Sequence, residues 1–219
     1  MVGNLGEPTA MLKIHGRANS INVQKALWAA DECAVPFERN DVGGAFGGND
    51  QPWYRAMNPN GVVPTIDDGG YTLWESNAIV RYLCATHAAG TLWATDPKAR
   101  GEADRWMDWQ ATTVMTGMTT LFWGLIRTPP DKRDNAAIDA ARAPTSAVWA
   151  RLDGHLATRP YVAGEHFTMG DIPVGALCYR WLNLPFPRDD LPVLPHLQAW
   201  YERLAQRPAY RKHVMITMT

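Results

Sequence analysis

Two segments in the first half of the chain hold residues that could bind a small anionic molecule. Glu75 and Ser76 directly precede an apolar run at helical spacing, which predicts a helix that begins at this point. The first turn of a helix presents free backbone N–H groups and the positive end of the helix dipole, and both favour a carboxylate. Ser76 is therefore a candidate carboxylate ligand, although a serine at a helix start is more often only a cap.

A proline stands in the short apolar run from Val62 to Ile66. Because Pro64 has no backbone N–H, it fits where a turn leads into a strand rather than inside a paired central strand. The X-Pro bond is also the peptide bond at which the cis form is most readily reached, and we expect Val63–Pro64 to be cis. The backbone beside it would offer N–H and C=O groups to an extended peptide. Pro64 and Ser76 together favour a small anionic peptide as the ligand.

These two segments resemble the glutathione-binding half of the glutathione S-transferase family. The resemblance rests on N-P-N-G-V-V-P at residues 58–64 and E-S-N-A-I at residues 75–79, and it extends over about residues 11–216. It is nearest to bacterial members with an active loop of the form G-R-x-N-S-x-N-V-x-K, as at residues 16–25. The implied fold is α/β plus all-α, with a thioredoxin-like N-terminal domain followed by a helical-bundle C-terminal domain. A homodimer is implied as well.

The resemblance places the catalytic donor just after the first strand, within residues 17–22. The glutathione thiolate, rather than the thiol, is the nucleophile, and a hydrogen bond at a helix N-terminus favours the charged form. This segment contains neither Tyr nor Cys. Ser20 is therefore the first candidate for the donor and Asn19 the second, and either residue could instead only cap the helix.

The same resemblance implies roles in holding glutathione. Val63, beside Pro64, would pair its backbone with the cysteinyl part of the ligand. Glu75 would take the γ-glutamyl ammonium group and Ser76 the γ-glutamyl carboxylate. In a dimer, Asp108 could reach the ammonium group of the glutathione bound to the partner subunit, as an acidic or amide residue does in some relatives.

Further residues are candidates for the two ends of the site. Arg17 could meet a ligand carboxylate or remain a solvated loop arginine, and Gln51 or Arg39 could hold the glycyl carboxylate. An electrophile would lie against the first helix of the second domain. Thr112 and Met115 are the candidate residues that line its pocket there.

The hydrophobic pattern predicts the elements that position these residues. A strand at 11–15, a helix from about residue 20 and a strand at 36–42 predict a βαβ unit with parallel strands. A strand-turn-strand segment ending at residue 74 and the helix after residue 75 complete residues 11–87, which the resemblance assigns to a thioredoxin-like glutathione-binding domain. Residues 88–97 contain Gly90, Asp96 and Pro97, which is typical of a linker.

Residues 98–219 show no strand pattern and predict an all-helical C-terminal domain. Amphipathic runs predict one continuous helix over 98–126, a second over 134–158 that contains Pro144, and a fourth over 192–206. A capping pattern from Thr168 to Asp171 opens the third helix, and we expect a structural role for Asp171.

Composition excludes several other classes of protein. A net charge of −1 over 219 residues favours neither nucleic acid nor an anionic membrane as a partner. No run approaches the roughly 18–20 apolar residues of a membrane span, and residues 1–10 predict a disordered leader rather than a secretion signal. The histidines stand far apart and there is no CxxC, so no metal site is predicted. Cys33, Cys84 and Cys178 lie in apolar stretches, which is typical of free thiols in a reducing cytoplasm.

The activity implied by the resemblance is attack of the glutathione thiolate on a small-molecule electrophile, with glutathione as cosubstrate. Two alternatives stay open: a glutathione-dependent isomerase or dehalogenase on the same scaffold, and a non-catalytic glutathione-binding module, because a fold does not fix a function. A disulfide reductase is disfavoured because the active loop has no Cys. The sequence does not identify the electrophile.

Overall fold

The computed structural model describes residues 11–219, so the expectation for residues 1–10 lies outside the described residues. The first part of the chain forms a mixed sheet of four strands in the order β2-β1-β3-β4. Its strands are β1 (Leu12–His15), β2 (Phe37–Asn40), β3 (Thr65–Asp68) and β4 (Tyr71–Trp74). β1 is parallel to β2 and antiparallel to β3, and β3 is antiparallel to β4. Ile14 pairs with Ile66 at the buried centre of this sheet.

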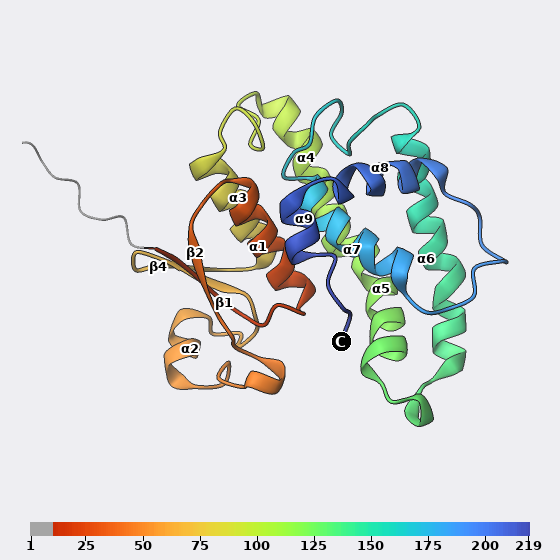
Figure 1. Cartoon of the computed structure of the whole chain (residues 1–219), viewed down its shortest axis with the longest axis horizontal. Helices are drawn as coiled ribbons and strands as arrows, with labels where there is room; N and C mark the ends of the chain where they lie inside the picture. Colours follow the sequence, from red (N-terminus) through yellow and green to blue (C-terminus); the bar gives the residue numbers. More distant parts are fainter. Residues whose placement is uncertain (1–10) are drawn as a thin grey trace, which may run out of the picture.

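The first part also contains α1 (Ile21–Glu32), α2 (Pro52–Met57) and α3 (Ser76–His87). Figure 1 shows α1 beside the sheet, where the sheet meets the helical part of the molecule. α1 packs against α3 and also against two helices of the second part, so most of its side chains are buried. The ring of Trp28, for example, lies 4.6 Å from that of Tyr210 and 5.6 Å from that of Phe167. This packing fixes the start of α1 where the two parts of the chain meet.

The described residues after Pro97 form helices and no named strand. The helices are α4 (Pro97–Trp109), α5 (Met115–Phe122), α6 (Asn135–Leu156), α7 (Asp171–Asn183), α8 (Pro195–Ala205) and α9 (Pro208–His213). Two single 3₁₀ turns, Gly44–Phe46 and Pro130–Lys132, lie in the connections. No helix in residues 11–219 is both long and apolar enough to cross a membrane.

The predicted continuous helix over 98–126 is interrupted in the structure by two π-helical turns, Gln110–Val114 and Trp123–Arg127. A π-helical turn holds an extra residue, so the side chains that follow it point in directions that a regular 3.6-residue period does not give. The helix predicted over 192–206 starts instead at Pro195, because proline is favoured in the first turn of a helix. The short α9 was not predicted.

Asp171 has the structural role expected from its capping pattern. It is fully buried, and its carboxylate accepts hydrogen bonds from the backbone N–H groups of Val162 and Thr168 at 3.0 and 2.9 Å. Nε1 of Trp200 donates a third, at 3.0 Å. Burial raises the pKa of this carboxyl group to about 6. Asp171 therefore joins the start of α7 to α8 and to the segment before it.

Candidate active site

The active loop, residues 16–20, connects β1 to α1 and is held by backbone hydrogen bonds to the end of β2. The N–H of Gly16 donates to Asn40 at 2.8 Å, and that of Arg17 donates to Val42 at 3.0 Å. Gly16 has a φ of 155°, and a Cβ at this position would overlap Val23 and lie 3.2 Å from Val63. The missing side chain therefore lets the active loop lie against Val63.

Val63 lies next to the active loop, and the Val63–Pro64 bond is cis, as expected. The carbonyl of the preceding residue, Val62, accepts hydrogen bonds from Tyr54 and Asn58 at 2.7 and 2.8 Å. The N–H and C=O of Val63 itself make no hydrogen bond within residues 11–219. These two groups are therefore available to an extended ligand.

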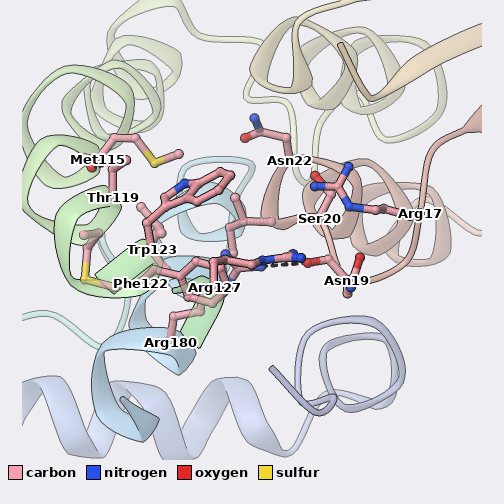
Figure 2. A pocket seen from close by; sticks show the side chains of 13 residues that line it. Arg17, Asn19, Ser20, Asn22, Met115, Thr119, Phe122, Trp123, Arg127 and Arg180 are labelled. Carbon is pink, nitrogen blue, oxygen red and sulfur yellow. Dashed lines mark hydrogen bonds between the residues drawn. The ribbon is translucent and has the colours of Figure 1, made fainter. Parts of the chain in front are cut away.

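Ser20 is the N-cap residue of α1, but its hydroxyl does not cap the helix. Its backbone is extended, with φ −82° and ψ 125°, and its carbonyl accepts from Gln24 at 2.9 Å. The residue is only 8% exposed, and its Oγ makes no hydrogen bond to any residue in the described part of the chain. The hydroxyl faces a cavity of about 160 Å³, which we call the Ser20 cavity (Figure 2).

Asn19, the second candidate donor, already uses its amide donor. Nδ2 donates to Oγ1 of Thr219 at 2.6 Å, and the backbone carbonyl accepts from Nη2 of Arg180 at 3.0 Å. Its buried Oδ1 has no hydrogen-bond partner among the described residues. An acceptor oxygen gives no stabilisation to a thiolate, so the side chain of Asn19 is less suited than Ser20 to that task.

Glu75 and Ser76 stand where β4 ends and α3 begins, as predicted. Ser76 is the first residue inside α3 and not its cap, because Glu75 holds the N-cap position. Glu75 has a φ of 69°, a left-handed conformation that is unfavourable for a residue with a Cβ and occurs preferentially at functional sites. Both residues line a second opening, which we call the Ser76 cleft. Asn22 and Met115 line both the cleft and the Ser20 cavity, so the two spaces adjoin.

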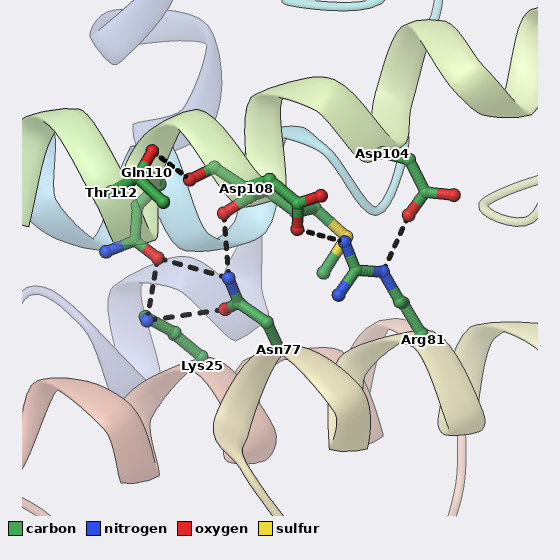
Figure 3. A network of polar contacts seen from close by, with 8 residues as sticks. Lys25, Asn77, Arg81, Asp104, Asp108, Gln110 and Thr112 are labelled. Atoms are coloured by element: carbon green, nitrogen blue, oxygen red, sulfur yellow. Dashed lines mark hydrogen bonds and ion pairs between the residues drawn. The ribbon is translucent and has the colours of Figure 1, made fainter.

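A buried lysine lies beneath the Ser76 cleft. Nζ of Lys25, on α1, donates to Oε1 of Gln110 at 2.8 Å and to Oδ1 of Asn77 at 3.3 Å (Figure 3). The same Nζ lies 3.4 Å from Oγ of Ser76. Burial lowers the pKa of this amine to about 7, against the opposing charge of Glu75. The Lys25 network thus joins α1, α3 and the turn after α4. It also places the amine of Lys25 behind the cleft, where it is positively charged when protonated.

Asp108 lies at the rim of the Ser76 cleft in its own chain. Its Oδ1 pairs with Nη2 of Arg81 at 2.6 Å, and Nε of the same arginine pairs with Asp104 at 2.6 Å (Figure 3). The side chain of Asp108 remains 70% exposed despite this pair. It is therefore accessible to a ligand in the cleft as well as to a neighbouring molecule.

The structure does not bring every predicted residue to these two spaces. Thr112 is exposed within the first π-helical turn, where its Oγ1 donates to the carbonyl of Asp108 at 2.9 Å. Gln51 is an exposed N-cap of α2, and its Nε2 donates to Asp50 at 3.3 Å. Arg39 donates to the carbonyl of Gly16 at 3.2 Å and also pairs with Asp41. Neither opening is lined by any of these three residues.

The Ser20 cavity is also lined by Phe122, Arg127 and Arg180, for which the sequence pattern gave no role, and by Trp123. Trp123, Arg127 and Phe122 reach it from the end of α5 and the following π-helical turn, and Arg180 reaches it from α7. Figure 2 shows these side chains opposite Ser20 and Arg17. Arg180 stands in a helix whose other residues are mostly buried and apolar, as Lys25 does in α1. A lone basic residue in an otherwise apolar helical pattern could have identified Lys25 and Arg180 from the sequence.

Models of known families match both halves of the chain. The model described as "Glutathione S-transferase, N-terminal domain" matches residues 19–86, and "Glutathione S-transferase, C-terminal domain" matches residues 135–203. Among individual relatives, Glutathione S-transferase GstB of Escherichia coli (strain K12) is 42% identical over 214 residues. That match spans 95% of this chain and 100% of the relative.

Solved structures agree with this assignment. The theta class glutathione S-transferase from Xanthomonas axonopodis pv. citri, with glutathione bound, is 53% identical and superposes with a TM-score of 0.91 over 95% of this chain and 99% of that chain. Glutathione transferase F2 from Populus trichocarpa is 23% identical with a TM-score of 0.81 over 93% and 97% of the two chains, and this likeness shows the fold alone. The expected fold class is confirmed, and the chain belongs to the glutathione S-transferase family.

Proposed function

We propose that this protein conjugates the thiolate of glutathione, its cosubstrate, to a small electrophile. The observation that carries the proposal is the free hydroxyl of Ser20 at the start of α1, in a cavity that adjoins the Ser76 cleft. A peptide of the size of glutathione can place its γ-glutamyl end in the cleft and its sulfur beside Ser20. The relative from Xanthomonas axonopodis was solved with glutathione bound, which supports this choice of cosubstrate.

In this proposal the Ser76 cleft holds the γ-glutamyl group. Oγ of Ser76 and the first N–H groups of α3 face the carboxylate, and the positive charge of Lys25 behind them adds to its stabilisation. Glu75 and Asp108 stand at the same cleft and suit the ammonium group. The free N–H and C=O of Val63 pair with the cysteinyl residue.

Ser20 then stabilises the thiolate and the electrophile is attacked from the Ser20 cavity. The Ser20 O–H donates to the sulfur, and the N-terminus of α1 adds its dipole, so the thiol loses its proton more readily. The sulfur forms a bond to the electrophilic carbon, and the leaving group departs with its electron pair. The rate gain comes from the lowered thiol pKa and from holding the two reactants together.

We further propose a homodimer that works in the cytoplasm and has the domain limits 11–87 and 98–219 with a linker at 88–97. Exposed Phe46 and Trp53, at 60% and 51%, lie close to α2, where a second copy of the chain can cover them. The three cysteines are free thiols, as a reducing compartment would keep them.

The test is a conjugation assay of the purified protein with glutathione and a panel of halogenated, epoxide and peroxide substrates, run beside calorimetric titration with glutathione. Conjugation that falls at neutral pH in Ser20→Ala, with glutathione affinity kept, is the expected result. Glutathione binding without turnover of any electrophile would support the non-catalytic binding module instead.

A further inference from the structure

Three arginine side chains from separate parts of the chain line the Ser20 cavity. Arg17 belongs to the active loop, Arg127 to the π-helical turn after α5, and Arg180 to α7. Figure 2 shows Arg17 on the side of the active loop and Arg127 and Arg180 on the helical side. Within residues 11–219, no Asp or Glu lines this cavity, and none of the three arginines forms a salt bridge.

Arg180 is the most deeply placed of the three. It is only 6% exposed, yet its guanidinium makes one hydrogen bond, to the carbonyl of Asn19, and otherwise lies 3.9 Å from the ring centroid of Phe122. Buried arginines normally pair with a carboxylate, because an isolated charge is costly to remove from water. Burial and the charges of Arg127 and Arg17 lower its pKa to about 9, so the group remains protonated at neutral pH.

The other two arginines are also without a countercharge. The buried Nε of Arg17 has no hydrogen-bond partner in the described part of the chain. Arg127 lies 5.6 Å from the same Phe122 ring on which Arg180 packs, and burial together with the charge of Arg17 lowers its pKa. Three like charges around one small space repel one another, and an anion bound between them would relieve both the repulsion and the missing hydrogen bonds.

Glutathione in the proposed pose does not supply that anion from its γ-glutamyl end, which lies in the Ser76 cleft. Arg127 and Arg180 come from the helical half of the molecule, on the side where Met115, Phe122 and Trp123 offer apolar contact to a second substrate. The Ser20 cavity has a volume of about 160 Å³, which favours a second substrate smaller than glutathione. The second substrate is therefore small.

We propose that the electrophile carries a carboxylate, which Arg127 and Arg180 hold while its reactive carbon faces the glutathione sulfur. This assignment rests on the proposed glutathione transfer and names the substrate class of that same site. Guanidinium groups suit a carboxylate because their paired N–H donors match its two oxygens. With a haloacid, the sulfur forms the new C–S bond and the halide leaves with its electron pair.

A matched pair of substrates tests the charge alone: chloroacetate and its neutral isostere chloroacetamide, each corrected for the uncatalysed reaction with glutathione. We expect the wild-type enzyme to have the higher kcat/KM, relative to the uncatalysed rate, for chloroacetate. Arg127→Met should lower that value roughly 10- to 100-fold, the loss expected for a charge-assisted hydrogen bond, and change it less than about threefold for chloroacetamide. Arg127→Lys should restore part of the preference.

Lys132→Met is the control, because Lys132 is an exposed cation close to Arg127 in sequence that does not line the cavity. It removes the same charge and should leave both substrates unaffected. Arg180→Met should repeat the effect of Arg127→Met if its thermal unfolding shows that it folds. The proposal is overturned if the wild-type enzyme does not prefer the anion or if Arg127→Met slows both substrates equally, which would assign the arginines to the thiolate. A rise in the glutathione KM alone would assign Arg127 to the glycyl carboxylate and also overturn it.

A binding measurement separates this inference from the proposed activity. Ligand-observed NMR of the glutathione-loaded protein with propionate and propionamide should show binding of the anion and not the amide, and Arg127→Met should remove it. If propionate binds in this way but neither chloro compound is conjugated, the proposed transfer fails while the anion site stands. If propionate and propionamide bind equally, or neither binds, the anion site is refuted whatever the activity.

Discussion

At the scale of single residues, the side chains of Asn19 and Ser20 in the active loop differ in the hydrogen bonds that they already make. Asn19 has its donor occupied by Thr219, whereas the hydroxyl of Ser20 has no partner among the described residues. The sequence placed both at the start of a helix, with Ser20 as the first candidate and Asn19 as the second, but it could not show that the amide of Asn19 is already bonded to a residue 200 positions away. The hydrogen bonds of the folded chain therefore support the proposal that Ser20 is the donor.

Ser20→Ala should raise the pKa of the enzyme-bound glutathione thiol by about one to two units, because a hydrogen bond to an anion contributes roughly 1.5–3 kcal/mol. The conjugation rate at neutral pH should fall and recover partly at high pH, where the thiol ionises unaided. Titration of the thiolate absorbance measures the shift. A shift in Asn19→Ala with none in Ser20→Ala would assign the role to the amide.

Ser76→Ala should raise the glutathione KM by an amount that corresponds to about 1–3 kcal/mol, the worth of a hydrogen bond to a charged group. Its effect on stability should be small, because Glu75 and not Ser76 occupies the N-cap position of α3. Kinetics and chemical denaturation of the same variant give the two values. Lower stability with an unchanged KM would mean that Ser76 serves only the helix.

Lys25 predicts a pH dependence of stability. Its pKa is lowered to about 7 in the folded chain, whereas an unfolded lysine titrates near 10.4, so between these values the unfolded state binds more protons. Wild-type stability relative to Lys25→Met should therefore rise with pH from 7 to 10, by roughly 1 kcal/mol per unit, and be lowest below pH 7. Denaturant titrations of both proteins at several pH values, without glutathione, check this. A difference that stays constant with pH would mean that Lys25 keeps its ordinary pKa.

At the scale of elements, the local sequence pattern predicts the regular helices and strands but not the π-helical turns. The strands, α1, α3 and α6 follow from alternation, 3.6-residue spacing and caps such as Asp134, which accepts from the N–H of Ala137 at 2.9 Å. The π-helical turns were not predicted, because a regular 3.6-residue period was applied to the whole segment and the extra residue of each turn changes the direction of the side chains after it. Thr112 was misplaced for that reason, and Arg127 was not considered.

Gly117 on α5 allows this helix to approach α6 closely. A Cβ on Gly117 would overlap Oγ1 of Thr145 on α6, so Gly117→Ala should destabilise the fold by about 1 kcal/mol, since overpacking outweighs the better helix propensity of alanine. Gly154→Ala, on α6, is the matched control, because no atom lies within 4 Å of its added Cβ. That variant should be stabilised by about 0.5–1 kcal/mol. Equal effects in chemical denaturation would contradict the close contact.

At the scale of the whole molecule, α1 joins the two halves. Glu32 at its end accepts from Nε and Nη2 of Arg207 at 2.8 and 2.5 Å, and Asp31 pairs with Lys212 and His213 at 2.8 and 2.7 Å. Because the same helix begins at Ser20 and carries Lys25, the site and the contact between the halves depend on one element. The family motif predicted the two-part architecture, but not these long-range pairs, which connect residues more than 170 positions apart.

We expect the protein to form a two-fold dimer. Light scattering at micromolar concentration should give twice the mass of one chain, and the double variant Phe46→Ala, Trp53→Ala should shift the population toward monomer, because it removes exposed apolar area. Tyr71→Ala, which also removes an exposed aromatic side chain but from β4, is the comparison. A wild-type protein that stays monomeric would refute the dimer and any role for Asp108 across it.

Because of the π-helical turn at Gln110–Val114, the direction of the side chains of α5 depends on the number of residues in this segment. The turn begins at Gln110, which contacts Lys25, and Met115 directly follows it. Met115 lines both the cleft and the cavity. Deleting one residue there would restore a regular helix and rotate everything after it by about 100°, the angle of one residue at 3.6 per turn. Met115, Phe122 and Arg127 would then leave the Ser20 cavity together. A single-codon deletion in this turn would therefore move every side chain of α5 that lines the cavity at once.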